Sequence, residues 1–164
     1  MRIFGLAGWS GSGKTTLLTG LIPELVARGL TVSTIKHAHH EFDIDRPGKD
    51  SWRHRQAGAS EVMVASARRW ALMHELRGAA EPPLDTLIAR MSPVDLLLVE
   101  GFKFNPHPKI EVYRPAVGKP LLYPEDSHIV AIACDEAIDA PLPVLPLGEP
   151  SAVASFIVAH CRAG

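Results

Sequence analysis

The stretch GWSGSGKTT, residues 8–16, separates two apolar runs of different periodicity. The run before it, RIFGLA (residues 2–7), is short and continuous, which is typical of a buried strand. Over residues 17–26, apolar side chains recur at helical spacing. TVSTIKH (residues 31–37) is rich in β-branched residues and predicts a second strand. Strand, helix and strand with short links predict a βαβ unit with parallel strands.

The stretch itself matches the phosphate-loop pattern G-x-x-x-x-G-K-[ST] at Gly8, Gly13, Lys14 and Thr15. Glycines let main-chain N–H groups approach phosphate oxygens, and the helix N-terminus adds a partial positive charge. In this pattern the lysine reaches the β- and γ-phosphates and neutralises developing charge, while the hydroxyl binds Mg²⁺. We therefore predict that a nucleotide contacts the whole loop, with Trp9 packed beside it: Gly8, Trp9, Ser10, Gly11, Ser12, Gly13, Lys14, Thr15 and Thr16.

A phosphate loop needs an acidic partner for its metal, and two carboxylates flank the apolar run LLLV. Asp95 and Glu100 lie five strand steps apart, about 16 Å, so one site cannot use both. Nucleotides bind at the carboxyl edge of a parallel sheet, where such a strand ends. Glu100, with Thr15, is therefore the predicted metal ligand, and Asp95 belongs to the opposite edge.

The loop after the second strand carries three histidines and several acids. His37, His39 and His40 have no cysteine nearby and form a weak zinc pattern; they line a polar pocket or are solvated. Asp43 and Asp45 are candidate catalytic residues, since either can bind the metal through water or position an attacking water.

Asp135 follows the predicted strand IVAIAC and is the candidate base-recognition residue. A carboxylate there would accept hydrogen bonds from N1–H and the exocyclic amine of guanine, a donor pair that adenine lacks. The surrounding IACD does not contain the N-K-x-D pattern of many guanine-binding proteins. The alternative is that Asp135 caps the next turn.

The rest of the chain fits one α/β domain over residues 1–164, a P-loop NTPase with a mostly parallel sheet flanked by helices. Residues 60–76 predict two short strands joined at residues 67–69. Residues 108–115 alternate between two prolines, which predicts an edge strand. These strands exceed what a five- or six-stranded core needs. As a β-extension, they would pair across a two-fold axis in a homodimer.

Composition limits the class of protein. The formal net charge is -1, which argues against a general nucleic-acid binder. No apolar run approaches membrane-spanning length, and the two cysteines fit no metal or redox spacing. We expect a cytoplasmic protein without a membrane or nucleic-acid partner.

Several stretches together resemble the molybdopterin-guanine dinucleotide biosynthesis protein B family: GWSGSGKTT, IKHAHHEFDIDRPGKDSWRHRQAGA, RRWALM, DLLLVEGFK and PKIEVYR. The resemblance covers about residues 2–135. It implies a dimeric protein that binds GTP with Mg²⁺ and hydrolyses it slowly. The expected role is that of an accessory to the guanylyltransferase that joins GMP from GTP to molybdopterin.

Three functions from different classes remain open at this point. The first is this accessory GTPase. The second is a small-molecule kinase, which normally has an arginine-rich lid. In the stretch where a lid is expected, residues 114–128, the only arginine is Arg114 and the only lysine is Lys119. The third is an adaptor that binds GTP and docks the transferase without hydrolysis. Transfer of labelled phosphate to an acceptor would identify a kinase, and nucleotide binding without phosphate release would identify the adaptor.

Overall fold

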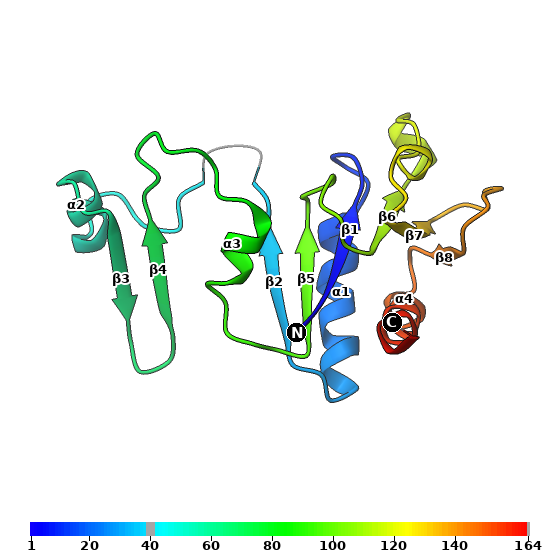
Figure 1. Cartoon of the computed structure of the whole chain (residues 1–164), viewed down its shortest axis with the longest axis horizontal. Coiled ribbons are helices and arrows are strands. Elements are labelled where there is room, and N and C mark those ends of the chain that lie inside the picture. The colour runs from blue at the N-terminus through cyan, green and yellow to red at the C-terminus, as the bar shows by residue number, and fades with distance from the viewer. Residues whose placement is uncertain (39–41, 164) are drawn as a thin grey trace. The chain divides into compact units, whose positions relative to one another are not determined.

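The computed structural model describes residues 1–38 and 42–163. The chain forms two compact units, one of residues 1–37 with 91–164 and one of residues 38–90 (Figure 1). The first unit contains six strands, two α-helices and two short 3-10 turns: β1 (Arg2–Ala7), α1 (Lys14–Ala27), β2 (Val32–Lys36), β5 (Leu96–Glu100), β6 (Lys109–Tyr113), η1 (Pro115–Val117), η2 (Tyr123–Glu125), β7 (Ile129–Cys134), β8 (Val144–Pro146) and α4 (Pro150–Ala163).

The six strands form one parallel sheet in the order β2-β5-β1-β6-β7-β8 (Figure 1). Every carboxyl end therefore lies at the same edge. The register is Lys36 opposite Glu100 and Glu100 opposite Leu6, so three strands end level with one another beside residues 8–16. This arrangement confirms the predicted mostly parallel α/β fold.

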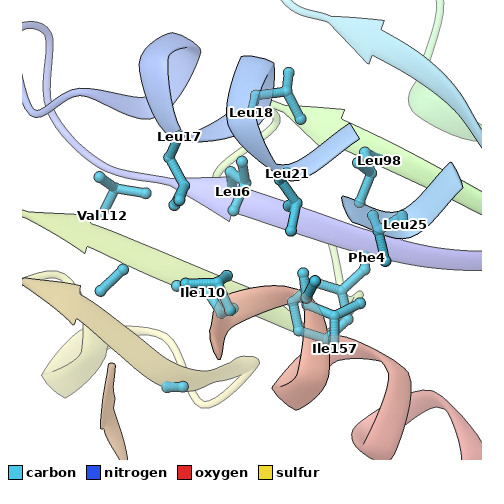
Figure 2. Close-up of a cluster of buried hydrophobic side chains, with 14 of the residues drawn as sticks. Phe4, Leu6, Leu17, Leu18, Leu21, Leu25, Leu98, Ile110, Val112 and Ile157 are labelled. Carbon is cyan, nitrogen blue, oxygen red and sulfur yellow. The ribbon is translucent and has the colours of Figure 1, made fainter. Parts of the chain in front are cut away.

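One face of the sheet forms the core with α1 and α4 (Figure 2). Leu17, Leu21 and Leu25 lie along one side of α1 and are buried, as helical spacing requires. They pack against alternate residues of the strands, among them Phe4, Leu6, Leu98, Ile110 and Val112, and against Ile157 of α4. Because side chains alternate along a strand, these positions define rows that face α1. The rows run to the carboxyl edge, and the residues at their ends form the site described below.

The prediction of an edge strand over residues 108–115 was wrong. β6 lies inside the sheet, paired with β1 on one side and β7 on the other. Its polar side chains, Lys109 and Glu111, are fully buried and have internal partners, whereas alternation normally indicates a solvated face. Pro108 and Pro115 lie just outside the strand, so neither removes a ladder hydrogen bond. β6 therefore cannot extend a sheet across a dimer axis.

The second unit contains α2 (Asp50–Gln56), β3 (Glu61–Ala65), β4 (Trp70–His74) and α3 (Leu84–Ile88). β3 and β4 form an antiparallel hairpin, which confirms the two short strands expected in residues 60–76. Met63 lies opposite Leu72, and Ala65 lies opposite Trp70, so these four side chains share one face. Met63, Leu72 and Trp70 are exposed.

Candidate functional site

Residues 8–13 form a tight loop between β1 and α1. Gly8 has φ 145°, and a Cβ there would lie 2.4 Å from the carbonyl oxygen of Val112. Gly13 precedes the first turn of α1 with φ 98°, in the left-handed region that favours glycine. Ser10, Gly11, Thr15 and Thr16 are exposed. The pattern therefore folds as expected, with its main chain open to a ligand at the N-terminus of α1.

Lys14 lies folded over this loop. Its ammonium group donates hydrogen bonds to the carbonyl oxygens of Gly8, at 2.9 Å, and Trp9, at 2.8 Å. Partial burial lowers the pKa of Lys14, Glu100 acts in the opposite direction, and the nearby Lys103 and Lys36 lower it further. The edge thus gathers several cations around one phosphate loop, which suits a polyanionic ligand.

The predicted metal ligands are in direct contact. The hydroxyl of Thr15 donates to Oε1 of Glu100 over 2.9 Å, and Glu100 is buried. Leu96, Leu98 and Glu100 occupy one row of β5 that faces α1, so the last residue of the row meets the first turn of that helix. A hydroxyl and a carboxylate are the oxygen donors that Mg²⁺ accepts alongside phosphate and water. The residues present therefore fit the metal.

Asp95 lies at the opposite end of β5, as predicted. Its Oδ2 accepts hydrogen bonds from the main-chain N–H of Thr31, at 2.8 Å, and from the Thr31 hydroxyl, at 2.6 Å. These bonds hold the pKa of Asp95 below its ordinary value. Asp95 thus holds the start of β5 beside the start of β2 and takes no part in the phosphate-loop edge.

Asp135 and Arg114 form an ion pair at this edge that the sequence did not reveal. Nε of Arg114 lies 2.8 Å from Oδ2 of Asp135. A Cβ on Gly13 would be 3.6 Å from the Arg114 guanidinium, so the pair borders the first turn of α1. Both side chains are about two-fifths exposed, and such a pair adds little stability. Asp135 is therefore held near the phosphate loop yet remains accessible.

Arg114 could have been found from the row to which it belongs. Ile110 and Val112 face α1 from β6, and Arg114, still extended, is the next residue of that row. Ala131 and Ala133 of β7 lead to Asp135 in the same way. On the face of the sheet that α1 and α4 cover, the rows of β5, β6 and β7 thus end in an acid, a base and an acid at one edge.

The polar groups of Trp9 and Ser12, both in this loop, differ in their hydrogen bonding. The indole Nε1 of Trp9 donates to the carbonyl oxygen of Pro120 over 2.8 Å, which places the ring beside the loop. Ser12 is buried, and its hydroxyl has no hydrogen-bond partner in the part of the chain that the structure describes. A buried hydroxyl without a partner is costly, so a ligand or water that bonds to it would be favoured.

Asp43 and Asp45 are held by Arg55 within the second unit. Nη2 of Arg55 lies 2.9 and 2.8 Å from the two carboxylate oxygens of Asp43 and donates to both. Nε of Arg55 lies 3.6 Å from Asp45, and Nη1 donates to Glu75 at 3.0 Å. The hydrogen bonds from Arg55 lower the pKa of Asp43. The predicted catalytic role of these two acids stays a prediction. The contacts that the structure shows for them join the loop to α2.

Of the three histidines in the loop, only His37 lies within the described residues. Its ring stacks on Phe102 with centroids 4.7 Å apart, and the predictions for His39 and His40 fall outside the described residues. Over residues 1–38 and 42–163, no group of three or more His, Cys, Asp or Glu side chains is arranged to hold a metal. No helix in this part of the chain is long and apolar enough to cross a membrane.

Comparison with known proteins gives consistent matches. The family model described as molybdopterin guanine dinucleotide synthesis protein B matches residues 3–135. The molybdopterin-guanine dinucleotide biosynthesis adapter protein of Escherichia coli K12 is 44% identical over 159 residues, which cover 95% of this chain and 91% of that protein. Its namesake in Haemophilus influenzae is 44% identical over 158 residues, which cover 94% and 86%. A crystal structure of molybdopterin-guanine biosynthesis protein B is 29% identical, covers 96% of this chain and 99% of that one, and aligns with a TM-score of 0.74.

Proposed function

The chain belongs to the molybdopterin guanine dinucleotide synthesis protein B family, and on this premise we propose that it binds GTP with Mg²⁺ at residues 8–16. Its role is that of an adapter in the step that forms molybdopterin guanine dinucleotide. One observation supports the nucleotide site above all others: the hydroxyl of Thr15 contacts the carboxylate of Glu100 beside the folded-over Lys14. A hydroxyl, a carboxylate and an ammonium group gathered at one helix N-terminus are the groups that a nucleotide with its metal requires.

Each residue of the edge has a distinct role in this proposal. Lys14 exchanges its bonds to the Gly8 and Trp9 carbonyls for phosphate oxygens, and the main-chain N–H groups of the loop surround the β-phosphate. Thr15 and Glu100 would hold Mg²⁺, which would supply charge neutralisation at the phosphates. Asp135 accepts hydrogen bonds from guanine after its carboxylate turns from Arg114, and the freed guanidinium stays near the α1 N-terminus as a counter-charge for phosphate.

Hydrolysis by this arrangement is slow. The proposal supplies positioning and charge neutralisation but assigns no general base in the first unit, and catalysis of this kind is slow. Asp43 and Asp45 remain the candidates for positioning water. The curated relatives are named adapter proteins, which favours an adapter function over a small-molecule kinase.

Replacing Glu100 with Gln tests the metal site. The amide still accepts a hydrogen bond from Thr15 but carries no charge, so we expect GTP affinity in saturating Mg²⁺ to fall roughly tenfold and to depend less on Mg²⁺. Calorimetric titrations with GTP at several Mg²⁺ concentrations measure both. Asp95→Asn, at the other end of the same strand, is the matched control and leaves GTP affinity unchanged. An unaltered Mg²⁺ dependence in Glu100→Gln would remove Glu100 from the metal site.

We further propose that the chain acts as a cytoplasmic homodimer through the hairpin of β3 and β4. A two-stranded hairpin is marginally stable by itself, and this one exposes 60% of Met63 and 63% of Trp70 on one face. Covering that face with the same face of a second copy would remove the apolar area from water.

The replacement Trp70→Glu is expected to convert the dimer to a monomer, because it removes the largest side chain of the apolar face and places a charge on that face. Light scattering at micromolar concentration measures the mass. Phe42→Glu changes an aromatic residue that is also exposed and lies outside the hairpin, and it should leave the dimer intact. A monomeric wild-type chain at this concentration would contradict the proposal.

A further inference from the structure

A cavity of about 520 Å³ lies at the amino edge of the parallel sheet, at the opposite end of the strands from the phosphate loop. Its walls come from the starts of β1 and β5, the segment after α1 and the end of α4. All of these belong to the first unit. The volume is typical of pockets that hold small organic molecules, so the chemistry of the lining decides which molecule would fit.

Part of the lining of this cavity is apolar. Leu96 of β5 and Ile157 of α4 are buried core residues that line it, and Leu30, Val94 and Val158 add apolar side chains that are half-buried. Covering apolar surface that water reaches is favourable. This part of the lining therefore favours a ligand with an apolar body, such as an aromatic ring.

The exposed part of the lining carries more positive than negative charge. Three arginines line the cavity, Arg2, Arg28 and Arg162, together with a single acid, Asp95. The acid does not neutralise them, because its Oδ2 accepts hydrogen bonds from Thr31. Within the described part of the chain, no ion pair joins Asp95 to an arginine. The cavity therefore has an excess of positive charge.

Two of the three arginines have no partner for their guanidinium groups. Nη2 of Arg28 donates to the carbonyl oxygen of Ser151 over 3.0 Å and lies 3.9 Å from Glu24. The side chains of Arg2 and Arg162 are exposed, and neither forms a hydrogen bond or an ion pair with any residue that the structure describes. Arg28 thus contributes to the packing of α1 and α4, whereas Arg2 and Arg162 are available to a ligand.

An arginine at the end of a helix can have a simpler explanation, because it compensates the partial negative charge there. Arg162 lies in the last turn of α4 and would serve this purpose. A helix end carries only about half an elementary charge, so one cation is enough. Arg2 is a second cation beside the same helix end: burial raises the pKa of the Cys161 thiol, and the charge of Arg2 acts in the opposite direction. The helix dipole therefore does not account for both arginines.

We propose that this cavity binds a small organic anion with an apolar body and a carboxylate or phosphate head group. The head group pairs with Arg2 and Arg162, and the apolar body covers the lining around Leu96 and Val158. A planar guanidinium can donate two parallel hydrogen bonds to either kind of head group. The ligand occupies the amino edge of the sheet, so it is distinct from the nucleotide at residues 8–16.

The test is a pair of calorimetric titrations of the full chain, one with naphthoate and one with naphthyl phosphate. We expect saturable binding, and the probe that binds more tightly identifies the head group. Naphthol, which has the ring without the anion, and acetate and inorganic phosphate, which have the anion without the ring, should each bind at least about tenfold more weakly. If neither naphthyl probe binds up to millimolar concentration, the proposal is wrong.

The variants Arg2→Gln and Arg162→Gln show where the probe binds. Each removes one charged hydrogen-bond donor, so each should weaken the tighter probe about tenfold. The fold should not change, because neither guanidinium contacts another described residue through a hydrogen bond or ion pair, and thermal unfolding checks this. Arg90→Gln is the matched control, since Arg90 is an exposed arginine of the second unit, and it should bind the probe like the wild type. Wild-type affinity in both Arg2→Gln and Arg162→Gln overturns the proposal.

Competition with GTP separates this cavity from the nucleotide site. Saturating GTP with Mg²⁺ should leave the affinity for the probe unchanged, and displacement of the probe would place it at residues 8–16 and contradict the proposal. A chain that binds the probe but not GTP would still support the cavity as a binding site, so the two proposals fail independently.

Discussion

Replacing Lys14 with alanine is expected to weaken GTP binding by about 100-fold. In our account this ammonium group forms charge-assisted hydrogen bonds to two phosphate groups, and each such bond contributes about 1.5–3 kcal/mol. The fold should survive, because in the chain without nucleotide Lys14 only bonds to the carbonyls of Gly8 and Trp9 at a partly exposed loop. Calorimetric titration with GTP and Mg²⁺ measures the loss.

Lys49→Ala is a suitable control for that experiment. Lys49 is an exposed cation in the second unit, and Lys49→Ala changes the net charge by the same amount as Lys14→Ala. GTP affinity should be unchanged in this variant. If Lys14→Ala and Lys49→Ala both bind like the wild type, the phosphates do not lie at residues 8–16.

Replacing Lys109 with methionine should produce the largest loss of stability. The methionine fills the space but leaves the Asp126 carboxylate and the carbonyls of Lys103 and Asn105 without their donor. Breaking a buried ion pair from one side costs about 3–5 kcal/mol. For a chain of this length the melting temperature should fall by about 10 °C. Thermal unfolding followed by circular dichroism measures the change.

The double variant Lys109→Met with Asp126→Asn tests whether the unpaired Asp126 carboxylate causes the loss of stability. It removes the uncompensated carboxylate charge, so part of the lost stability should return. The exposed Lys119→Met should melt like the wild type. A Lys109→Met chain with wild-type stability would show that Lys109 does not join the β5–β6 loop to Asp126.

The elements around the phosphate-loop edge could be predicted because two physical rules act together. The apolar periods locate strands and helix, and parallel strands all end at the same edge. That reasoning correctly separated Glu100 from Asp95, although both flank the same apolar run. Arg114 escaped it because an arginine before a proline resembles any strand end. Only its place in the row with Ile110 and Val112 indicates that it reaches the α1 N-terminus.

Other features depend on partners that a linear pattern does not specify. In β6, Lys109 and Glu111 look like solvent-facing residues of an edge strand, and only their distant partners explain their burial. For Asp43 and Asp45, the sequence does not indicate the partner that holds both, Arg55, which lies ten or more residues away. An alternating pattern in a strand, or several acidic residues in a loop, indicates only that the side chains are polar. Which partners they contact is determined by the fold.

A calorimetric comparison of GTP with GMP, both in excess Mg²⁺, tests most directly whether residues 8–16 hold a triphosphate. The account predicts saturable binding of GTP and affinity for GMP at least about 100-fold lower, because GMP lacks the two phosphates that Lys14 and the metal contact. Equal affinities for the two nucleotides, or no heat with GTP, would contradict it.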